Sequence, residues 1–392
     1  MARGYQGEVV VNGYSEQWLR QGFPWVYPKE VLSKPKRLKP GTPVKLRSKG
    51  GHDFGVGLWD TGWIAVRRFP GEHAVDLSDA LTAAVDLRDV VVDPETTAYR
   101  VVAAENDHLP GIRVDRWGWH LVISLDSASL MPLVDPLCDW LEQRMDARGI
   151  HLAWRIDPRD KGKSGGPPRL LRGHEAPADV RVTERGMAML VRPKAKDTGL
   201  YTDMRDNRAW LEPHWGGRRV LNLFAHTGAF SVSAALNGAS CVTSVDLSEV
   251  YLDRAEANFV ANELDPGLHE FVASDVRREL DRLRRTGERF DAVVLDPPSF
   301  SHGPDGKLSV EKDYGRLVAQ SLRVMQPGAW LIAALNHGKV SPKQFHGSIK
   351  EGAKKAGRDL QLLFQGGQAA DHPSGSWFPE GRYLKFAVFR AL

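Results

Sequence analysis

The chain has 392 residues, with 53 Lys and Arg against 49 Asp and Glu, a net charge of +4, and 42% hydrophobic residues. This length exceeds what one domain usually holds, so two or three domains are expected in a protein of ordinary globular composition. Two cysteines exclude a disulfide framework and a metal site of the usual cysteine spacing, which favours a reducing cytoplasm. The N-terminus lacks the apolar core of a signal peptide, and no apolar run reaches the bilayer-spanning length of about 18 residues, so no membrane partner is expected.

The first predicted domain, residues 1–72, consists mainly of short strands separated by Gly and Pro, a pattern typical of a small β-barrel. The stretch from Trp18 to Tyr27 is expected to form a helix and a turn instead. Eight cations lie between residues 29 and 49, with only Glu30 against them. A solvated lysine-rich face would explain this cluster, but the aromatic residues nearby favour a nucleic-acid-binding surface.

The second predicted domain, residues 73–184, has the alternation of a small α+β unit. Helices are expected near residues 77–87 and 130–145, and strands near 99–102, 112–115, 121–125 and 152–156. Cys138 falls on the apolar face of the second helix, which favours a core position over chemistry. Residues 160–174, rich in Gly, Pro, Lys and Arg, predict a loop that either contacts RNA phosphates or is an ordinary surface loop.

The third predicted domain, residues 185–392, alternates strands and helices from Val220 onwards, the rhythm of a parallel α/β sheet. An apolar strand, a small-residue turn containing Gly228 and an apolar helix follow one another at residues 219–231. The next strand ends in Asp246, where an acid typically accepts hydrogen bonds from ribose hydroxyls. Because the turn lacks the G-x-G-x-x-G pattern of dinucleotide sites, this order favours S-adenosylmethionine (SAM) as the cofactor.

Distinctive motifs extend over nearly the whole chain: 23–27 (FPWVY), 109–116 (LPGIRVDR), 198–205 (TGLYTDMR), the 222–231 turn, 296–300 (DPPSF), 368–373 (QAADHP) and 378–385 (FPEGRYLK). With them the sequence resembles the bacterial 23S rRNA methyltransferases that join a PUA RNA-binding domain, a small central domain and a class I SAM domain. The resemblance implies an α/β fold whose Rossmann-like C-terminal domain follows a PUA-like β-barrel and a central α+β domain. It also implies a cytoplasmic enzyme acting on ribosomal RNA, and a possible homodimer, since family members are often dimers.

The resemblance also implies roles for individual residues. The predicted cofactor-binding residues are Asn222, Phe224, Gly228, Asp246, Asp275 and Asp296, the predicted substrate-binding residues are Tyr201, Arg205, Phe300 and Lys339, and the predicted catalytic residues are Asn336 and Asp296. Structural alternatives stay open for four of them. Asp246 would otherwise be a solvated acid at a strand end, Asp275 a helix N-cap, Phe300 a core contact, and Asn336 a residue that only holds its loop.

Asn336 is the departure that decides the expected chemistry. The family members that make 5-methylcytosine carry a cysteine nucleophile at this place, because carbon 5 of cytosine needs a thiolate added to carbon 6. Cys241 starts the strand that Asp246 ends, about 17 Å away at roughly 3.3 Å per residue, and so lies at the wrong edge of the sheet. Cys138 belongs to another predicted domain.

A ring nitrogen such as N7 of guanine needs no covalent help, only alignment with the sulfonium methyl group in a dry site. The guanine-N7 half of the bifunctional 23S rRNA methyltransferase has asparagine in this block, and Asn336 and Lys339 are similar to that pattern. The predicted product is therefore 7-methylguanosine in 23S rRNA. The alternatives are methylation of another base position, including carbon 5 of cytosine, and a non-catalytic RNA-binding or ribosome-assembly factor.

Overall fold

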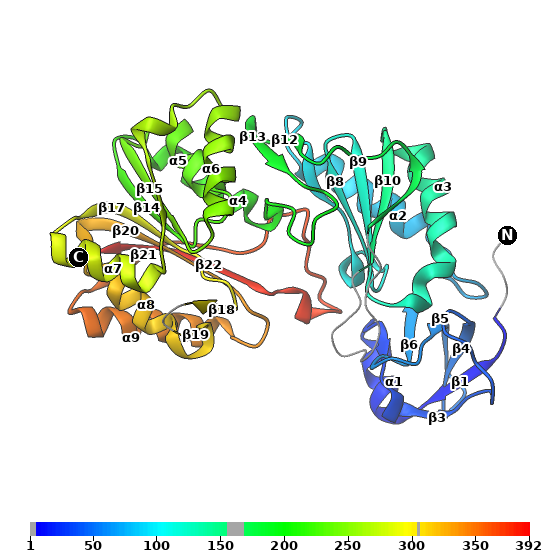
Figure 1. Ribbon diagram of the computed structural model, residues 1–392. Helices are drawn as coiled ribbons and strands as arrows, with labels where there is room; N and C mark the ends of the chain where they lie inside the picture. Colours follow the sequence, from blue (N-terminus) through cyan, green and yellow to red (C-terminus); the bar gives the residue numbers. More distant parts are fainter. Residues whose placement is uncertain (1–4, 155–167, 304–305) are drawn as a thin grey trace. The chain divides into compact units, whose positions relative to one another are not determined.

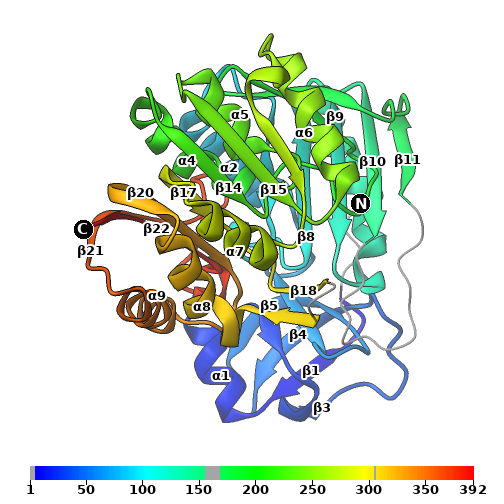
Figure 2. The same cartoon turned by 60° about the vertical axis from the view of Figure 1, so that its left-hand side comes forward.

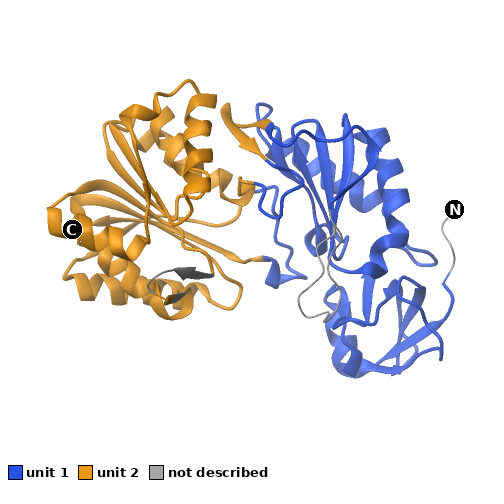
Figure 3. Ribbon diagram, viewed as in Figure 1, with its two compact units in different colours: residues 1–180, 192–198, 370–381 blue, residues 181–191, 199–369, 382–392 orange. Residues whose placement is uncertain are grey.

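The computed structural model describes residues 5–154, 168–303 and 306–392 (Figure 1). They form two compact units (Figure 3). Unit 1 comprises Met1–Val180, Arg192–Thr198 and Ala370–Gly381, and unit 2 comprises Arg181–Val191, Gly199–Ala369 and Arg382–Leu392. No helix within the described ranges combines the length and apolarity needed to cross a bilayer.

The first sheet of unit 1 has six strands in the order β2-β6-β5-β4-β1-β3. Its elements are β1 (Glu8–Val11), α1 (Gly13–Arg20), β2 (Trp25–Val26), β3 (Val31–Ser33), β4 (Pro43–Ser48), β5 (Asp53–Trp59) and β6 (Val66–Phe69). Val9 and Val11 alternate into its core with Val44 and Leu46. Helix α1 starts where the Asn12 side chain accepts the Ser15 N–H at 2.9 Å. The predicted short strands and helix are thus present.

The second sheet of unit 1 has the order β11-β10-β9-β8-β7. It comprises β7 (Ala98–Ala103), β8 (Ile112–Trp117), β9 (His120–Leu125), β10 (Gly149–Trp154) and β11 (Arg169–Gly173), accompanied by α2 (Ser78–Val91) and α3 (Val134–Arg144). The predicted helix at residues 130–145 begins as a 3₁₀ turn that contains Pro132, because proline cannot continue an α-helical ladder.

The predicted loop at residues 160–174 is wrong at its C-terminal end. Strand β11 occupies Arg169–Gly173 and pairs antiparallel with β10, whereas residues 155–167 lie outside the described ranges. Pairing with a strand distant in sequence supplies the backbone hydrogen bonds that a loop would leave to water. Composition alone therefore could not reveal this strand.

A segment near the C-terminus completes unit 1. Residues 370–381, between β21 and β22, bring Asp371 to the second sheet of unit 1. There its carbonyl accepts a hydrogen bond from Nη2 of Arg88, and its carboxylate accepts one from the backbone N–H of Arg100, both at 2.8 Å. Trp377 donates to the carbonyl of Glu105 at 3.0 Å. These groups are largely buried, so the segment is an integral part of the unit 1 core.

Unit 2 is built on a seven-stranded sheet of order β16-β15-β14-β17-β20-β22-β21. Its strands are β14 (Arg219–Leu223), β15 (Cys241–Asp246), β16 (Glu270–Ala273), β17 (Phe290–Leu295), β20 (Met325–Asn336), β21 (Leu360–Gly366) and β22 (Leu384–Ala391). The first five in chain order are parallel, and β22 runs antiparallel to both β20 and β21. The predicted parallel α/β sheet is confirmed, with its strand order reversing beside β14, where such sheets bind ligands.

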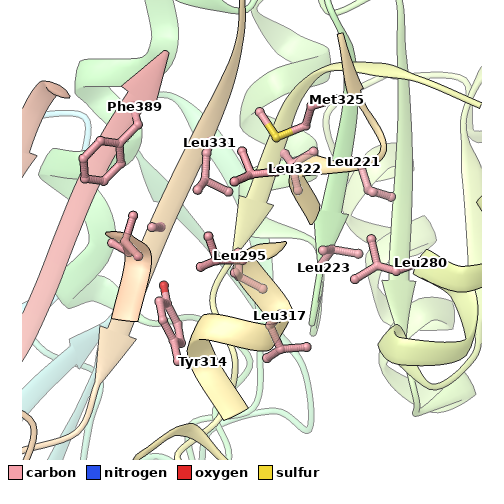
Figure 4. Packing of buried hydrophobic residues seen from close by; sticks show 14 of the residues in the cluster. Leu221, Leu223, Leu280, Leu295, Tyr314, Leu317, Leu322, Met325, Leu331 and Phe389 are labelled. Carbon is pink, nitrogen blue, oxygen red and sulfur yellow. The ribbon is translucent and has the colours of Figure 1, made fainter. Parts of the chain in front are cut away.

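Helices cover both faces of this sheet (Figure 2). They are α4 (Arg205–Leu211), α5 (Ala229–Leu236), α6 (Glu249–Ala261), α7 (Val276–Thr286), α8 (Val310–Leu322) and α9 (Pro342–Ala356). Leu221 and Leu223 of β14 belong to a core cluster on one face that includes Leu280 of α7 and Leu317 of α8 (Figure 4), while Val220 belongs to the cluster on the other face with residues of α4 and α5. This two-sided burial explains the apolar strands of the sequence. Two short hairpins, β12 (Val180–Glu184) with β13 (Met187–Val191) and β18 (Phe300–Gly303) with β19 (Gly306–Ser309), complete the unit.

Candidate active site

The turn between β14 and α5 has an uncommon backbone conformation. Phe224, His226 and Gly228 have φ angles of 59°, 53° and 78°, in the left-handed region that residues other than glycine rarely adopt. A Cβ on Gly228 would lie 2.9 Å from the Cβ of Ala255, so glycine also permits the close approach of helix α6. Backbone strain of this kind concentrates at ligand-binding and catalytic sites, and it marks this turn as a candidate.

Asn222 supports the turn from within the protein. Its side chain is 2% exposed, and Nδ2 donates to Oγ of Ser231 at 2.9 Å. The Ser231 hydroxyl in turn lies 2.7 Å from that of Ser244. This buried polar network links β14 to α5 and β15, so Asn222 acts on the turn through its neighbours.

Asp246 lies at the end of β15, as predicted, and is level with the turn because Leu223 pairs with Val245. Its Oδ2 accepts the N–H of His226 and its Oδ1 accepts the N–H of Ser248, each at 2.9 Å. Each carboxylate oxygen retains a lone pair for a further donor such as a hydroxyl. The geometry is compatible with the predicted ribose contact, which stays a prediction.

Three rings from different segments meet at the turn. The His226 ring centroid lies 5.3 Å from that of Tyr201 and 4.4 Å from that of Tyr251. The Thr227 hydroxyl donates to the carbonyl of Gly199, which anchors the loop before Tyr201 to the turn. Tyr201 remains 54% exposed, so the predicted substrate-binding loop presents an aromatic ring beside the candidate cofactor turn.

Asp275 is the N-cap of helix α7, which confirms the structural alternative for this residue. Its carboxylate accepts the backbone N–H of Arg277 at 2.8 Å and the guanidinium of the same residue at 2.8 Å. These hydrogen bonds hold the pKa of Asp275 below its usual range. A cap can still accept a ligand donor, so the predicted cofactor contact of Asp275 stays a prediction.

Asp296 directly follows β17, whose last residue Leu295 pairs with Leu223 on one side and with Ala333 on the other. Burial and the nearby carboxylate of Asp203 raise the pKa of Asp296 to about 7, although the Arg208 guanidinium opposes this. Glu184 binds that guanidinium through two contacts of 2.7 and 2.6 Å. Asp203 itself accepts the Tyr383 hydroxyl at 2.9 Å. The site therefore holds a carboxyl group that changes charge near neutral pH.

Asn336 is the last residue of β20 and is exposed. The Ser299 hydroxyl donates to its carbonyl oxygen at 2.7 Å, so the segment that carries Asp296 contacts the segment that carries Asn336. Lys339 follows on the same loop and is also exposed. Arg205, at the start of α4, is only 2% exposed, which leaves little of its side chain for an RNA contact. The side chain of Phe300 lies outside the described residues.

Neither cysteine offers a nucleophile at this edge of the sheet. Cys241 begins β15 and pairs with Arg219 at the opposite end of the strands from Asp246, and burial raises the pKa of its thiol. Cys138 is fully buried on α3, where desolvation raises its pKa to about 11. Thiolates, not thiols, are the reactive form, so both environments disfavour nucleophilic catalysis.

Several polar residues of the site escaped the sequence-based prediction, namely Ser248, Tyr251, Ser299, Tyr314, Tyr383 and Lys385. They come from segments that only the fold brings together. Three of them lie in motifs that the sequence singles out, Ser299 in 296–300 and Tyr383 and Lys385 in 378–385, and Lys385 is also a buried charge within the otherwise largely apolar strand β22.

Comparisons with known proteins agree with this geometry. The family described as S-adenosylmethionine-dependent methyltransferase matches residues 174–363, and a PUA-like domain matches residues 9–69. Among solved structures, a methyltransferase crystallised with SAH is similar at a TM-score of 0.85, with 25% identity over 98% of this chain and 99% of that chain. A SAM-dependent methyltransferase from Streptococcus mutans aligns with a TM-score of 0.81, again with 25% identity and with 98% and 99% coverage.

The fold and the site thus define a SAM-dependent methyltransferase with an N-terminal PUA-like domain. Proteins named ribosomal RNA large subunit methyltransferase I are 32% identical in Aeromonas salmonicida (97% of this chain, 98% of the relative) and 33% identical in Shewanella amazonensis (96% and 97%). The chain belongs to this family of ribosomal RNA large subunit methyltransferases I, and SAM is its cofactor.

Proposed function

We propose that this protein transfers the methyl group of SAM to a base of large-subunit ribosomal RNA, and that the product is 7-methylguanosine. The relatives' names support ribosomal RNA as the substrate. The observation that supports guanine N7 as the target is the exposed Asn336 at the end of β20, where a nucleophilic mechanism would require cysteine. We further propose three domains, at 1–72, 73–184 and 185–392, and action in the cytoplasm.

The proposed cofactor contacts lie along one edge of the parallel sheet. Phe224 and Gly228 would shape the turn around SAM, Asn222 would support it, Asp246 would accept the ribose hydroxyls, and Asp275 the adenine amino group. Tyr201, Lys339 and Phe300 would contact the RNA. Arg205 would order their loop, given its burial.

Transfer to N7 needs little from the protein beyond alignment. The N7 lone pair attacks the methyl carbon, the carbon–sulfur bond breaks, and the positive charge moves from the sulfonium to the purine. Asn336 could donate its amide N–H to O6 of guanine and leave N7 free to react. The ionised form of Asp296 would stabilise the charge that develops on the base.

Carbon 5 of cytosine is the alternative target. Methylation there requires a thiolate. Of the two cysteines of this chain, Cys138 is fully buried and Cys241 lies at the end of β15 opposite to Asp246. A non-catalytic role in RNA binding is an alternative of another class. The presence of the turn after β14 together with Asp246 and Asp296 argues for cofactor binding and against that role.

The decisive experiment is nucleoside mass spectrometry. Ribosomal RNA from a strain that lacks the gene is incubated with the pure protein and methyl-labelled SAM. We expect label in 7-methylguanosine, and label in 5-methylcytosine would overturn the proposed base. If no nucleoside is labelled and SAM fails to raise the melting temperature, the binding-only alternative is correct.

A further inference from the structure

The segment that carries Asn336 is held by side chains through its backbone. Three residues at or just beyond the end of β20, Ala334, Asn336 and His337, have carbonyl oxygens that accept hydrogen bonds from side chains of other elements. Tyr314 of α8 donates to Ala334 at 2.9 Å, Ser299 donates to Asn336 at 2.7 Å, and Lys385 of β22 donates to His337 at 2.6 Å. The end of β20 is therefore fixed from a helix, from the loop after β17 and from a neighbouring strand.

Lys385 is the unusual member of this set. Its side chain is 7% exposed, within a strand whose other side chains are nearly all buried and apolar. Nζ donates to the carbonyls of His337 and Tyr383, at 2.6 and 2.8 Å, so both of these hydrogen bonds go to backbone oxygens. Burying an ammonium group is unfavourable, and it lowers the pKa of Lys385. Core packing alone would be served better by an apolar residue such as methionine.

The location of Lys385 points to the adjoining loop. In the antiparallel register of β20 and β22, Leu335 pairs with Lys385 and Asn336 pairs with Leu384. The Lys385 side chain extends past this pair to the first residue beyond the strand, His337. The backbone is thus held at two consecutive residues. Ser299 binds the carbonyl of Asn336, and Lys385 binds the carbonyl of His337.

We propose that Lys385 is a positioning residue that acts through the His337 carbonyl to hold Asn336 in the orientation required for methyl transfer. This inference rests on the proposed role of Asn336. The Lys385 side chain is too deeply buried to bind a phosphate of the RNA, and its hydrogen bonds go to backbone carbonyls. A positioning role explains why a charge is retained in an apolar strand.

The test compares Lys385→Met with a matched control. Arg218→Met also removes a cation that donates to two backbone carbonyls, at 2.7 and 3.2 Å. Arg218 is half-buried and lies just before β14, at the other end of the strands. We expect Lys385→Met to lower kcat by about 10- to 100-fold, with the KM for RNA and the Kd for SAM nearly unchanged. Arg218→Met should lose thermal stability and keep its kcat.

A double-mutant cycle tests whether Lys385 works through Asn336. If it does, adding Lys385→Met to Asn336→Ala will slow transfer little beyond Asn336→Ala alone. Equal slowing in both backgrounds, or an unchanged kcat in a folded Lys385→Met protein, would overturn the inference. Ser299→Ala offers a second route to the same segment if Lys385→Met does not fold, and its effect should likewise vanish beside Asn336→Ala.

The same samples separate this inference from the proposed function. The transfer rate is measured from the total label incorporated into RNA, whichever nucleoside carries it, whereas mass spectrometry identifies the labelled base. Label outside 7-methylguanosine would refute the proposed product without removing a rate coupling between Lys385 and Asn336. Absence of that coupling would refute the positioning role whichever base is labelled.

Discussion

The carboxylate of Asp246 accepts the backbone N–H of His226 at 2.9 Å, across the space between β15 and the turn that follows β14. His226 has a positive φ angle, so this hydrogen bond helps to hold a backbone conformation that the residue would otherwise rarely adopt. One acid therefore shapes the turn and is also the proposed ribose acceptor.

Replacing Asp246 by alanine should weaken SAM binding by about 10- to 100-fold, because charge-assisted hydrogen bonds to the turn and to the ligand are lost together. Isothermal titration measures the Kd. Asp265→Ala is the control, since Asp265 also accepts a backbone N–H two residues on, at 2.9 Å, in an exposed turn. Unchanged SAM affinity in Asp246→Ala would contradict the assignment.

Alanine at Gly228 should be more destabilising than alanine at Gly287. The two glycines have nearly equal φ angles of 78° and 80°, but only the first has a close neighbour, the Ala255 Cβ at 2.9 Å from an added Cβ. We expect about 1 kcal/mol from backbone strain in each variant. Overpacking should add about 1–3 kcal/mol in Gly228→Ala. Chemical unfolding gives both values, and equal losses would show that α6 yields to the added methyl group.

The rate of methyl transfer should rise with pH and level off above about 7, the pKa of Asp296. The ionised carboxylate is the form that stabilises positive charge on the base. Asp296→Asn should be slower and lose this dependence. Asp291 lies at the other end of β17, where it accepts the Arg219 N–H, and Asp291→Asn, which likewise removes a carboxylate charge, should keep the wild-type profile. A profile unchanged by Asp296→Asn would mean that another group titrates.

Stability should respond to pH in the opposite direction. The pKa of Asp296 is higher in the folded chain than the usual value of 3.8, so the folded state binds more protons between the two values. The contribution of Asp296 to the free energy of unfolding therefore falls as pH rises through this window. Asp296→Asn should gain stability relative to wild type at about pH 8 and lose most of that advantage at about pH 5. Urea unfolding at the two pH values measures the difference.

A cysteine-free protein should remain an active methyltransferase. Cys138→Ala and Cys241→Ala remove both thiols of the chain. We expect a stability loss, mainly at the fully buried Cys138, and a kcat close to wild type. Loss of transfer in a folded cysteine-free protein would show that a thiol takes part, and the single variants would identify which one.

Local sequence was enough to predict the sheet edge of the site. Val220 to Leu223 form a mostly apolar run that is typical of a strand buried on both faces, and the acids at residues 246 and 296 end or follow two further strand-like runs. Because parallel strands end at one edge, their order alone brings these acids to the same side. The structure confirms the strands and where they end.

Contacts between distant segments could not be predicted in this way. Strand β11 exists because β10 pairs with it, and the ring of His226 meets Tyr201 and Tyr251 only after α5 and α6 pack. The role of Lys385 depends on the antiparallel register of β22, which no local pattern encodes. Such features follow from tertiary packing, which overrides residue propensity.

The inclusion of residues 370–381 in unit 1 has a consequence for synthesis of the chain. A ribosome releases the N-terminal residues first, and domains generally begin to fold as they emerge. The hydrogen bond from the buried guanidinium of Arg88 to the Asp371 carbonyl nevertheless forms only after Asp371 has been synthesised. The ring contacts of Phe23 and Trp25 with Phe378 likewise form late. The unit translated first can therefore close its core only when translation is nearly finished, and a fragment cut before residue 370 should be a poor stand-in for it.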